Sequence, residues 1–419
     1  MDVLRFAQQR VKAFLDEVER LSGAEFPHEH SSTALDRLRD RFRNHLNQLE
    51  QLTPESDSGV VKQQCRLVLD DLFTYLPLLG FILRSTNVRN AFEVFGPFLR
   101  LARVVLEPSV PAASGKTKLL LSSEWDFSPF TYPAIPALPG YLFIGLPAPE
   151  SSNPLLLPLA GHELGHAVWL DRDLETQFRV RAKQCVIAAI TDRWSEYVSI
   201  FGPLVSSASE LTTNLLAVET WTRSVALCVC QAEETFCDFV GLRLFRESYL
   251  HSFCYLLSPN FGARSERYPD MSRRIENLLH ASTRYSVAYD TEYQNSFDSS
   301  DPPQLSREDE FRLSIADEAL KVLVPKLVLL ADQEVRTAAL PERNPDEIGR
   351  ILKWFRRVTP AEGCQSVPDI LNAAWLAYLD PNLWQNLPVI REKRDLVLKE
   401  LTLKNLEIFE IEQIQKDPL

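Results

Sequence analysis

The chain has 419 residues, of which 45% are hydrophobic and 24% are charged, and its net charge is −12. This composition is ordinary for a globular protein and excludes a disordered or fibrous chain. The excess of acidic residues repels nucleic acid, and the short basic clusters alternate with acidic and apolar residues at helical spacing. We therefore expect no nucleic-acid partner.

The cysteines and the apolar segments indicate the cellular compartment of the protein. Seven cysteines are scattered without the paired spacings of a disulfide framework, which indicates free thiols in a reducing compartment. The N-terminal segment lacks the uninterrupted apolar core of a signal peptide. The most apolar stretch, 72–83, contains Pro77 and is too short to span a bilayer. We therefore expect a soluble, cytoplasmic protein with no membrane span.

The N-terminal region predicts a series of helices. Apolar residues recur at intervals of three and four over 3–21 and again over 35–49, which is the period of an amphipathic helix. Two further helices are expected over 60–83 and 91–106, and the second is expected to bend near Pro97.

The composition then changes in a way that predicts a small sheet. Residues 108–117 are rich in proline, glycine and serine, which is typical of a linker. Two short apolar runs, 119–123 and 140–147, have the length of strands, and a proline-rich stretch, 127–139, lies between them.

The rest of the chain predicts helices almost throughout. One helical region extends from 153 to 257, and another helix is expected over 268–282. The polar segment 290–303 predicts a loop or linker, and amphipathic helices with proline breaks follow from 306 to the end. The expected fold class is therefore mainly α with a small β-sheet.

One helix carries the pattern of a metal site. His162 and His166 lie four residues apart within the expected helix 155–170, so both imidazoles are on one face and can bind a single metal ion. Glu163 follows the first histidine and can act as general base toward a water that zinc activates. A catalytic zinc site has three protein ligands and one open position, so a third ligand is required.

The flanks of this helix favour a buried site over two surface histidines on an ordinary helix. Apolar residues precede and follow the motif, in 155–160 and 167–170. Gly161 and Gly165 each weaken the helix by about 1 kcal/mol relative to alanine. Glycine is understandable here if the backbone packs close to a metal or to a neighbouring helix.

The third ligand has two candidates. Asp171 is close in sequence but falls just past the expected end of the helix. Glu234 lies on a long apolar helix, 231–245, with Asp238 on the same face. A carboxylate in apolar surroundings is costly unless it is paired. We expect Glu234 to bind zinc and Asp238 to accept a hydrogen bond from a ligand imidazole; the alternative is a helix whose acids simply face water.

The two motifs together resemble those of a known family. His162-Glu-x-x-His166, followed by Glu234-x-x-x-Asp238, is similar to the gluzincin pattern, especially that of the relatives of the CAAX-processing and heat-shock proteases. The resemblance covers roughly 117–282. It implies one zinc ion per chain, bound by the two histidines and Glu234, with the glutamate of the first motif as base. It also implies an edge strand before the first motif, in the position of 140–147.

A later segment extends the resemblance and also departs from it. The family's His-Pro followed by Arg and Ile is similar to the segment from Tyr268 to Ile275, where tyrosine replaces the histidine. The candidates to stabilise the oxyanion are therefore Tyr268, Arg273 and Arg274, because a hydrolase needs such a donor. The family's membrane spans have no counterpart, so no membrane substrate is implied.

We therefore predict a zinc metalloendopeptidase acting on a protein or peptide substrate. Its expected parts are a helical N-terminal domain (1–107), a zincin-like core (117–282) and a helical C-terminal region (304–419). The outer parts are large enough to recognise a regulatory protein partner. The alternatives are a catalytically idle zinc-binding scaffold or peptide sensor, against which Glu163 argues, and a metal-free helical interaction protein, which would require both motifs to be accidental.

Overall fold

The computed structural model describes most of the chain. The described residues are 3–52, 56–86, 91–124, 130–132, 135–202, 207–259, 264–298, 304–338, 340–385, 387 and 389–417. Within them the fold is mainly α-helical with one small sheet, which confirms the predicted fold class. The chain divides into two compact units, Met1–Leu99 with Lys116–Asn153 (unit 1) and Arg100–Gly115 with Pro154–Leu419 (unit 2).

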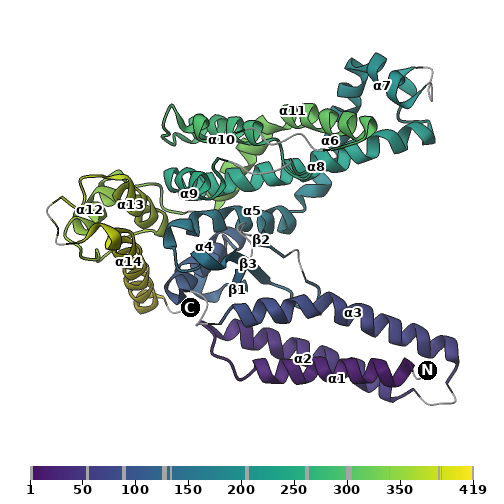
Figure 1. Cartoon of the computed structure of the whole chain (residues 1–419), viewed down its shortest axis with the longest axis horizontal. Helices are drawn as coiled ribbons and strands as arrows, with labels where there is room; N and C mark the ends of the chain where they lie inside the picture. The colour runs from purple at the N-terminus through teal and green to yellow at the C-terminus, as the bar shows by residue number, and fades with distance from the viewer. Residues whose placement is uncertain are drawn as a thin grey trace. The chain divides into compact units, whose positions relative to one another are not determined.

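Three long helices form most of unit 1. They are α1 (Val3–Leu21), α2 (Glu29–Glu50) and α3 (Ser58–Arg84), and α1 packs against both of the others (Figure 1). The apolar residues that recur every three or four positions face one another, as the ring centroids of Phe14 and Phe42 do at 4.2 Å. α1 and α3 match the predicted helices closely, whereas α2 begins at Glu29, six residues before the predicted start at 35.

A three-stranded sheet completes unit 1. The strand order is β1 (Lys118–Glu124), β3 (Tyr141–Pro147) and β2 (Phe130–Thr131). β1 and β3 are parallel, and the two-residue β2 pairs antiparallel with β3. The predicted strands are confirmed, but β3 is the central strand, so the edge position that the family resemblance implied for 140–147 is wrong.

The units differ from the domains expected from sequence, 1–107, 117–282 and 304–419. The sheet belongs with the N-terminal helices because Leu120 and Phe143 are part of the hydrophobic core that α1, α2 and α3 form. The C-terminal residues belong to the same unit as the motif helices, because a long helix near 320 packs along the helix that carries Glu234. The hydrophobic periodicity of a segment does not show which distant segments it packs against.

Unit 2 is a helical assembly (Figure 1). Its helices are the second half of α4 (Phe95–Leu106), η4 (Pro154–Leu159), α5 (Ala160–Asp171), α6 (Leu174–Asp192), α7 (Trp194–Phe201), α8 (Leu215–Phe245), α9 (Glu247–Leu257), α10 (Met271–Tyr285), α11 (Arg307–Thr337), α12 (Pro345–Phe355), α13 (Val367–Leu379) and α14 (Arg394–Lys416). Single 3₁₀ turns lie at Phe92–Val94 (unit 1), Ala112–Ser114 (unit 2), Ala148–Glu150 (unit 1), Ala208–Glu210, Tyr293–Ser296 and Arg391–Lys393 (all in unit 2).

The centre of unit 2 is α8, which contacts α5, α6, α10 and α11. In its second half, 231–245, nearly all side chains are buried, including Phe236, Phe239 and Phe245, which is typical of a core helix. Asn214 caps its first turn by accepting hydrogen bonds from the next backbone amides. Because this half of α8 is surrounded, Glu234 and Asp238 are buried as well, and both carboxylates lie against His162 of α5.

Two general expectations can be compared with the structure. No helix in the described ranges is both long and apolar enough to cross a membrane. All seven cysteines are free.

The predicted polar linker 290–303 contains a 3₁₀ turn, and its last five residues, 299–303, lie outside the described residues.

Candidate metal centre

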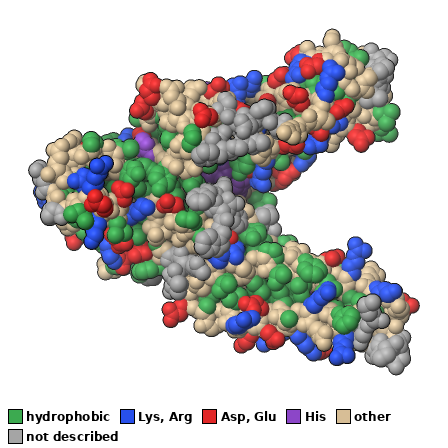
Figure 2. Space-filling view, in the orientation of Figure 1, with side chains coloured by type: hydrophobic (Ala, Val, Ile, Leu, Met, Phe, Trp, Pro, Cys, Tyr) green, Lys and Arg blue, Asp and Glu red, His purple; other side chains and the backbone are tan. Residues whose placement is uncertain are grey.

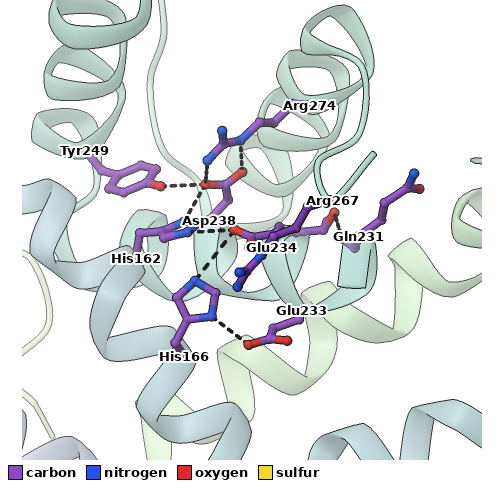
Figure 3. A network of polar contacts seen from close by, with 10 residues as sticks. His162, His166, Gln231, Glu233, Glu234, Asp238, Tyr249, Arg267 and Arg274 are labelled. Atoms are coloured by element: carbon purple, nitrogen blue, oxygen red, sulfur yellow. Dashed lines mark hydrogen bonds and ion pairs between the residues drawn. The ribbon is translucent and has the colours of Figure 1, made fainter. Parts of the chain in front are cut away.

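The motif residues of α5 and α8 converge on one point (Figure 3). Nε2 of His162 lies 3.1 Å from Oε2 of Glu234, and Nε2 of His166 lies 3.6 Å from the same oxygen. Ligand atoms held about 2.1 Å from a tetrahedral zinc ion lie about 3.4 Å from one another. The two separations lie on either side of that value, so the distance from Glu234 to each histidine is compatible with a shared zinc ion.

Two glycines let the helices approach this closely. A Cβ atom on Gly165 would lie 2.7 Å from the Cα of Cys237, and one on Gly161 would lie 3.0 Å from the Cα of Gly241. Both contacts are with the backbone of α8, which cannot move aside as a flexible side chain can. The expectation that these glycines serve close helix packing is confirmed.

The outward-facing nitrogen of each histidine contacts a carboxylate. Nδ1 of His162 lies 2.9 Å from Oδ1 of Asp238, and Nδ1 of His166 lies 2.8 Å from Oε1 of Glu233. Metal-ligating histidines almost always donate their second ring N–H in this way, which leaves the other nitrogen free for the metal. The two carboxylates thus place the free nitrogens, both Nε2, toward Glu234.

Asp238 is held from three sides. It accepts hydrogen bonds from the Tyr249 hydroxyl at 2.8 Å and from Nε and Nη2 of Arg274 at 2.6 and 2.8 Å. Burial opposes its ionisation, but Arg274 and His162 together outweigh burial and hold the pKa of Asp238 well below its usual range. Tyr249 itself is fixed by packing, because a Cβ on Gly241 would lie only 2.3 Å from its ring.

Glu234 is fully buried and yet ionised. Burial alone would raise its pKa, but the hydrogen bond with His162 and the surrounding positive charges lower the pKa to about 2. Its second oxygen, Oε1, accepts a hydrogen bond of 2.5 Å from Nε of Arg267. One oxygen therefore faces the histidines while the other is held in place, as a monodentate metal ligand requires.

Burial alone would lower the pKa of His162. Its contacts with Asp238 and Glu234 outweigh burial and raise that pKa to about 10. These carboxylates therefore favour the protonated imidazole, and metal binding by His162 would be in competition with that proton.

Glu163 is the buried acid that remains free. It is 4% exposed, and no hydrogen bond or ion pair among the described residues engages its carboxylate. Burial raises its pKa, against the nearby imidazoles of His162 and His166, which lower it. A carboxylate beside the ligands, without a partner of its own, is suited to accept a proton.

The three oxyanion candidates occupy different surroundings. Tyr268 is half-buried, with its ring 4.9 Å from Cζ of Arg274, and burial and the charge of Glu234 raise the pKa of its hydroxyl. Arg274 is occupied by its two bonds to Asp238. The guanidinium of Arg273 pairs with Glu276 at 2.6 Å and is 38% exposed, and no contact described for it reaches the cluster. Tyr268 is therefore the one with a free, protonated donor.

Two other side chains bear on the ligand set. Asp171 is the last residue of α5 and is exposed, and it pairs with the arginine that follows it, so the structure does not bring it to the cluster. Cys237 is buried, and its Sγ lies within 4.8 Å of one ring nitrogen each of His162 and His166. This thiol is a further group that could hold a metal, although it lies against Gly165 and burial raises its pKa well above its usual value.

Sequence reasoning missed Glu233, Arg267 and Tyr249. Glu233 precedes the expected ligand and was indistinguishable from a surface acid. Arg267 directly precedes Tyr268, so it lies just outside the segment that resembles the family. Tyr249 belongs to the next helix, and no local pattern connects it with Asp238.

No protein-family model matches the chain, and searches of curated proteins and of solved structures found no significant match.

Proposed function

We propose that this chain is a zinc-dependent metallopeptidase that hydrolyses peptide bonds in a protein or peptide substrate. The observation that carries the proposal is the convergence of both Nε2 atoms, of His162 and His166, on one oxygen of Glu234. A carboxylate on each Nδ1 and a free acid next to the first histidine complete the set that hydrolytic zinc chemistry requires.

His162, His166 and Glu234 would hold the zinc ion. When bound, zinc supplies a Lewis acid that polarises the scissile carbonyl and lowers the pKa of a water molecule. Glu163 accepts the proton of the attacking water and passes it to the nitrogen of the leaving amine. Its burial supports this role, because a raised carboxyl pKa favours holding the proton between the two transfers.

Tyr268 is the proposed oxyanion donor. Its hydroxyl stays protonated at neutral pH because burial and the charge of Glu234 raise its pKa. A neutral donor aimed at a developing oxyanion contributes more in a buried site than in water. Arg274 acts through Asp238 as a positioning residue, since both of its hydrogen bonds end on that carboxylate.

A second candidate function is a zinc-binding scaffold or peptide sensor without catalysis. Cys237 favours it, because a thiolate added to the three other ligands would close the coordination sphere, as in structural zinc sites. The free carboxylate of Glu163 favours the peptidase, because a closed site has no use for a base.

The test compares wild type with Glu163→Gln. Both are purified without added metal, their zinc content is measured, and each is incubated with a degenerate peptide library whose new N-termini are identified by mass spectrometry. We expect equal zinc contents and a loss of cleavage in Glu163→Gln of about 10²- to 10⁴-fold. Wild type that takes up no zinc, or a variant as active as wild type, would contradict the peptidase.

We propose that the chain acts in the cytoplasm, because its seven cysteines are free.

We also propose a surface on unit 1 that binds the substrate or a regulatory protein. Figure 2 shows hydrophobic side chains gathered along the helices of this unit. Phe73, Leu76 and Leu83 lie on one side of α3 and are each about half exposed. Replacing Phe73 and Leu76 by glutamate should slow cleavage of a folded protein substrate but not of a short peptide; equal rates on both would contradict this role.

A further inference from the structure

A cavity in unit 2 is lined by five arginines. It has a volume of about 350 Å³ and is formed where α8, α10 and α11 end and α12 begins. The arginines are Arg243, Arg246, Arg284, Arg336 and Arg343. The acids that line it are Asp332 and Glu342, so the lining has three more positive than negative charges. This is a strong local reversal in a chain with a net charge of −12.

The contacts of these arginines leave most of their donors unused. Nε of Arg243 and Nε of Arg336 both bond Oδ1 of Asp332, at 2.7 and 3.0 Å. Nε of Arg343 lies 3.3 Å from a carboxylate oxygen of Glu247. Exposed Arg284 forms no ion pair within the described residues. No hydrogen bond described for these four uses a terminal amino group, and each guanidinium has four such N–H donors.

Arg246 is held in the cavity at a cost. Its φ of 60° and ψ of −131° lie in a region that side chains rarely adopt, and glycine would fit there without strain. Nη2 donates to the carbonyl of Ser286 at 3.1 Å, but Nε is buried without a hydrogen-bond partner. Strained residues of this kind collect at ligand sites, where the surroundings hold them in place.

Three helices end at this cavity, and arginines at helix C-termini also offset the negative end of the helix dipole. Each C-terminus corresponds to about −0.5 charge, the N-terminus of α12 to about +0.5, and Glu247 beside Arg343 adds one negative charge, so about one of the three excess positive charges remains. Among the hydrogen bonds described for the five arginines, only that of Arg246 to Ser286 reaches a carbonyl at a helix end. Dipole compensation therefore leaves an unneutralised charge and unused donors.

We infer that this arginine pocket binds a small anion that carries several phosphate groups. Its volume is within the range of about 300–1,000 Å³ that small-molecule sites occupy. A phosphate brings up to about two charges and three acceptor oxygens, where a carboxylate brings one charge and two oxygens. Paired guanidinium donors match phosphate geometry. The inference does not depend on the zinc site or on peptidase activity.

The test is calorimetric titration of the full chain with inorganic tripolyphosphate at physiological ionic strength, with orthophosphate in parallel. We expect one tripolyphosphate per chain and weaker binding of orthophosphate. Arg284→Glu should weaken tripolyphosphate binding at least about tenfold, because it removes one charged donor and adds an acid. Arg181→Glu is the control, since Arg181 is exposed on α6 and has no described ion pair. Any heat from chelation of zinc by tripolyphosphate should be the same in Arg181→Glu as in wild type, so this control also accounts for it.

A second variant guards against a folding defect. Arg246→Gly removes a guanidinium and at the same time relieves the backbone strain, so it should keep the thermal midpoint and lose at least about tenfold in affinity. Wild type that binds no tripolyphosphate, or equal losses in Arg284→Glu and Arg181→Glu, would overturn the inference. Tighter binding of a hexaglutamate peptide than of tripolyphosphate would overturn the assignment to phosphates.

Discussion

Nδ1 of His162 lies 2.9 Å from Oδ1 of Asp238, a carboxylate that is 2% exposed. Because Asp238 also accepts from Tyr249 on α9 and Arg274 on α10, three helices fix the orientation of one imidazole of α5. Removing the charge of Asp238 would leave Arg274 buried without its partner, at a cost of about 3–5 kcal/mol. Variants of Asp238 therefore mix effects on metal binding with effects on folding.

Glu233 separates the two effects. It contacts His166 in the same way but is 26% exposed and has no arginine partner among the described ion pairs. We expect Glu233→Gln to weaken zinc binding about tenfold or more without lowering the thermal midpoint. Competition with a chelating dye measures the affinity. Glu219→Gln, at an exposed position of the same helix, should bind zinc as wild type does, and equal affinities of the two variants would rule out the positioning role.

The choice between Glu234 and Cys237 as third ligand can be made from metal content. We expect about one zinc ion per chain in wild type and in Cys237→Ala, and little zinc in Glu234→Ala, since the carboxylate oxygen is 3.1 and 3.6 Å from the two imidazoles. Elemental analysis gives the content and circular dichroism checks folding. Loss of zinc in Cys237→Ala would favour the closed scaffold.

Close packing of α5 on α8 predicts an unusual response to alanine. Alanine usually stabilises a helix by about 1 kcal/mol relative to glycine. In Gly165→Ala the new Cβ would lie 2.7 Å from the Cα of Cys237, so we expect a net loss of about 1–3 kcal/mol in the free energy of unfolding. Gly349→Ala on α12, where the Cβ meets no atom within 4 Å, should instead stabilise by about 0.5–1 kcal/mol. Urea denaturation compares them, and a stabilised Gly165→Ala would contradict the packing argument.

Unit 1 contains a pair whose stability contribution depends on pH. Asp71 accepts two hydrogen bonds from Arg41 and contacts His45 at 2.7 Å. Burial opposes its ionisation, but these contacts outweigh burial and lower the pKa of Asp71 below 3.8. The contribution is therefore complete above about pH 4 and is lost as the pH falls through the lowered value.

The variant Asp71→Asn tests this directly. At neutral pH it should unfold about 1 kcal/mol more easily than wild type, a figure kept small because the pair is partly exposed. The difference should shrink as the pH falls below about 4, where wild-type Asp71 becomes protonated. Asp70→Asn is the matched control, because Asp70 is 67% exposed and lies 3.7 Å from Arg66. A difference that persists at low pH would mean that packing, and not charge, is lost.

The features that could be predicted from the sequence are those set by residues close to one another along the chain. The proximity of His162, His166, Glu234 and Asp238 could be predicted because a spacing of four places two side chains on one face of a helix. The helices of unit 1 and the strands β1 and β3 were found because their apolar periods are local and clear. The close packing at Gly165 could be predicted from the cost of glycine in a helix, but its partner on α8 could not.

The misses are features that depend on distant segments. The sheet belongs to unit 1 because Leu120 and Phe143 share the core of its helices, and no local pattern records this. The role of Arg274 was missed because the acid that it pairs with is on another helix. The arginine pocket draws on four separate segments, three of which end a helix while Arg343 precedes α12, and in none of them is an arginine unusual.

The contact of Gly241 with Tyr249 has a consequence for how this chain can diverge. Any side chain at 241 would displace the phenol ring, which lies 2.3 Å from where its Cβ would be, and the ring's hydroxyl holds the acid behind His162. Position 241 touches no proposed ligand, yet its substitution would act on metal affinity through two neighbours. In a set of related sequences, loss of glycine at 241 should therefore accompany loss of the histidine motif, as a marker of copies that have given up the chemistry and kept the fold.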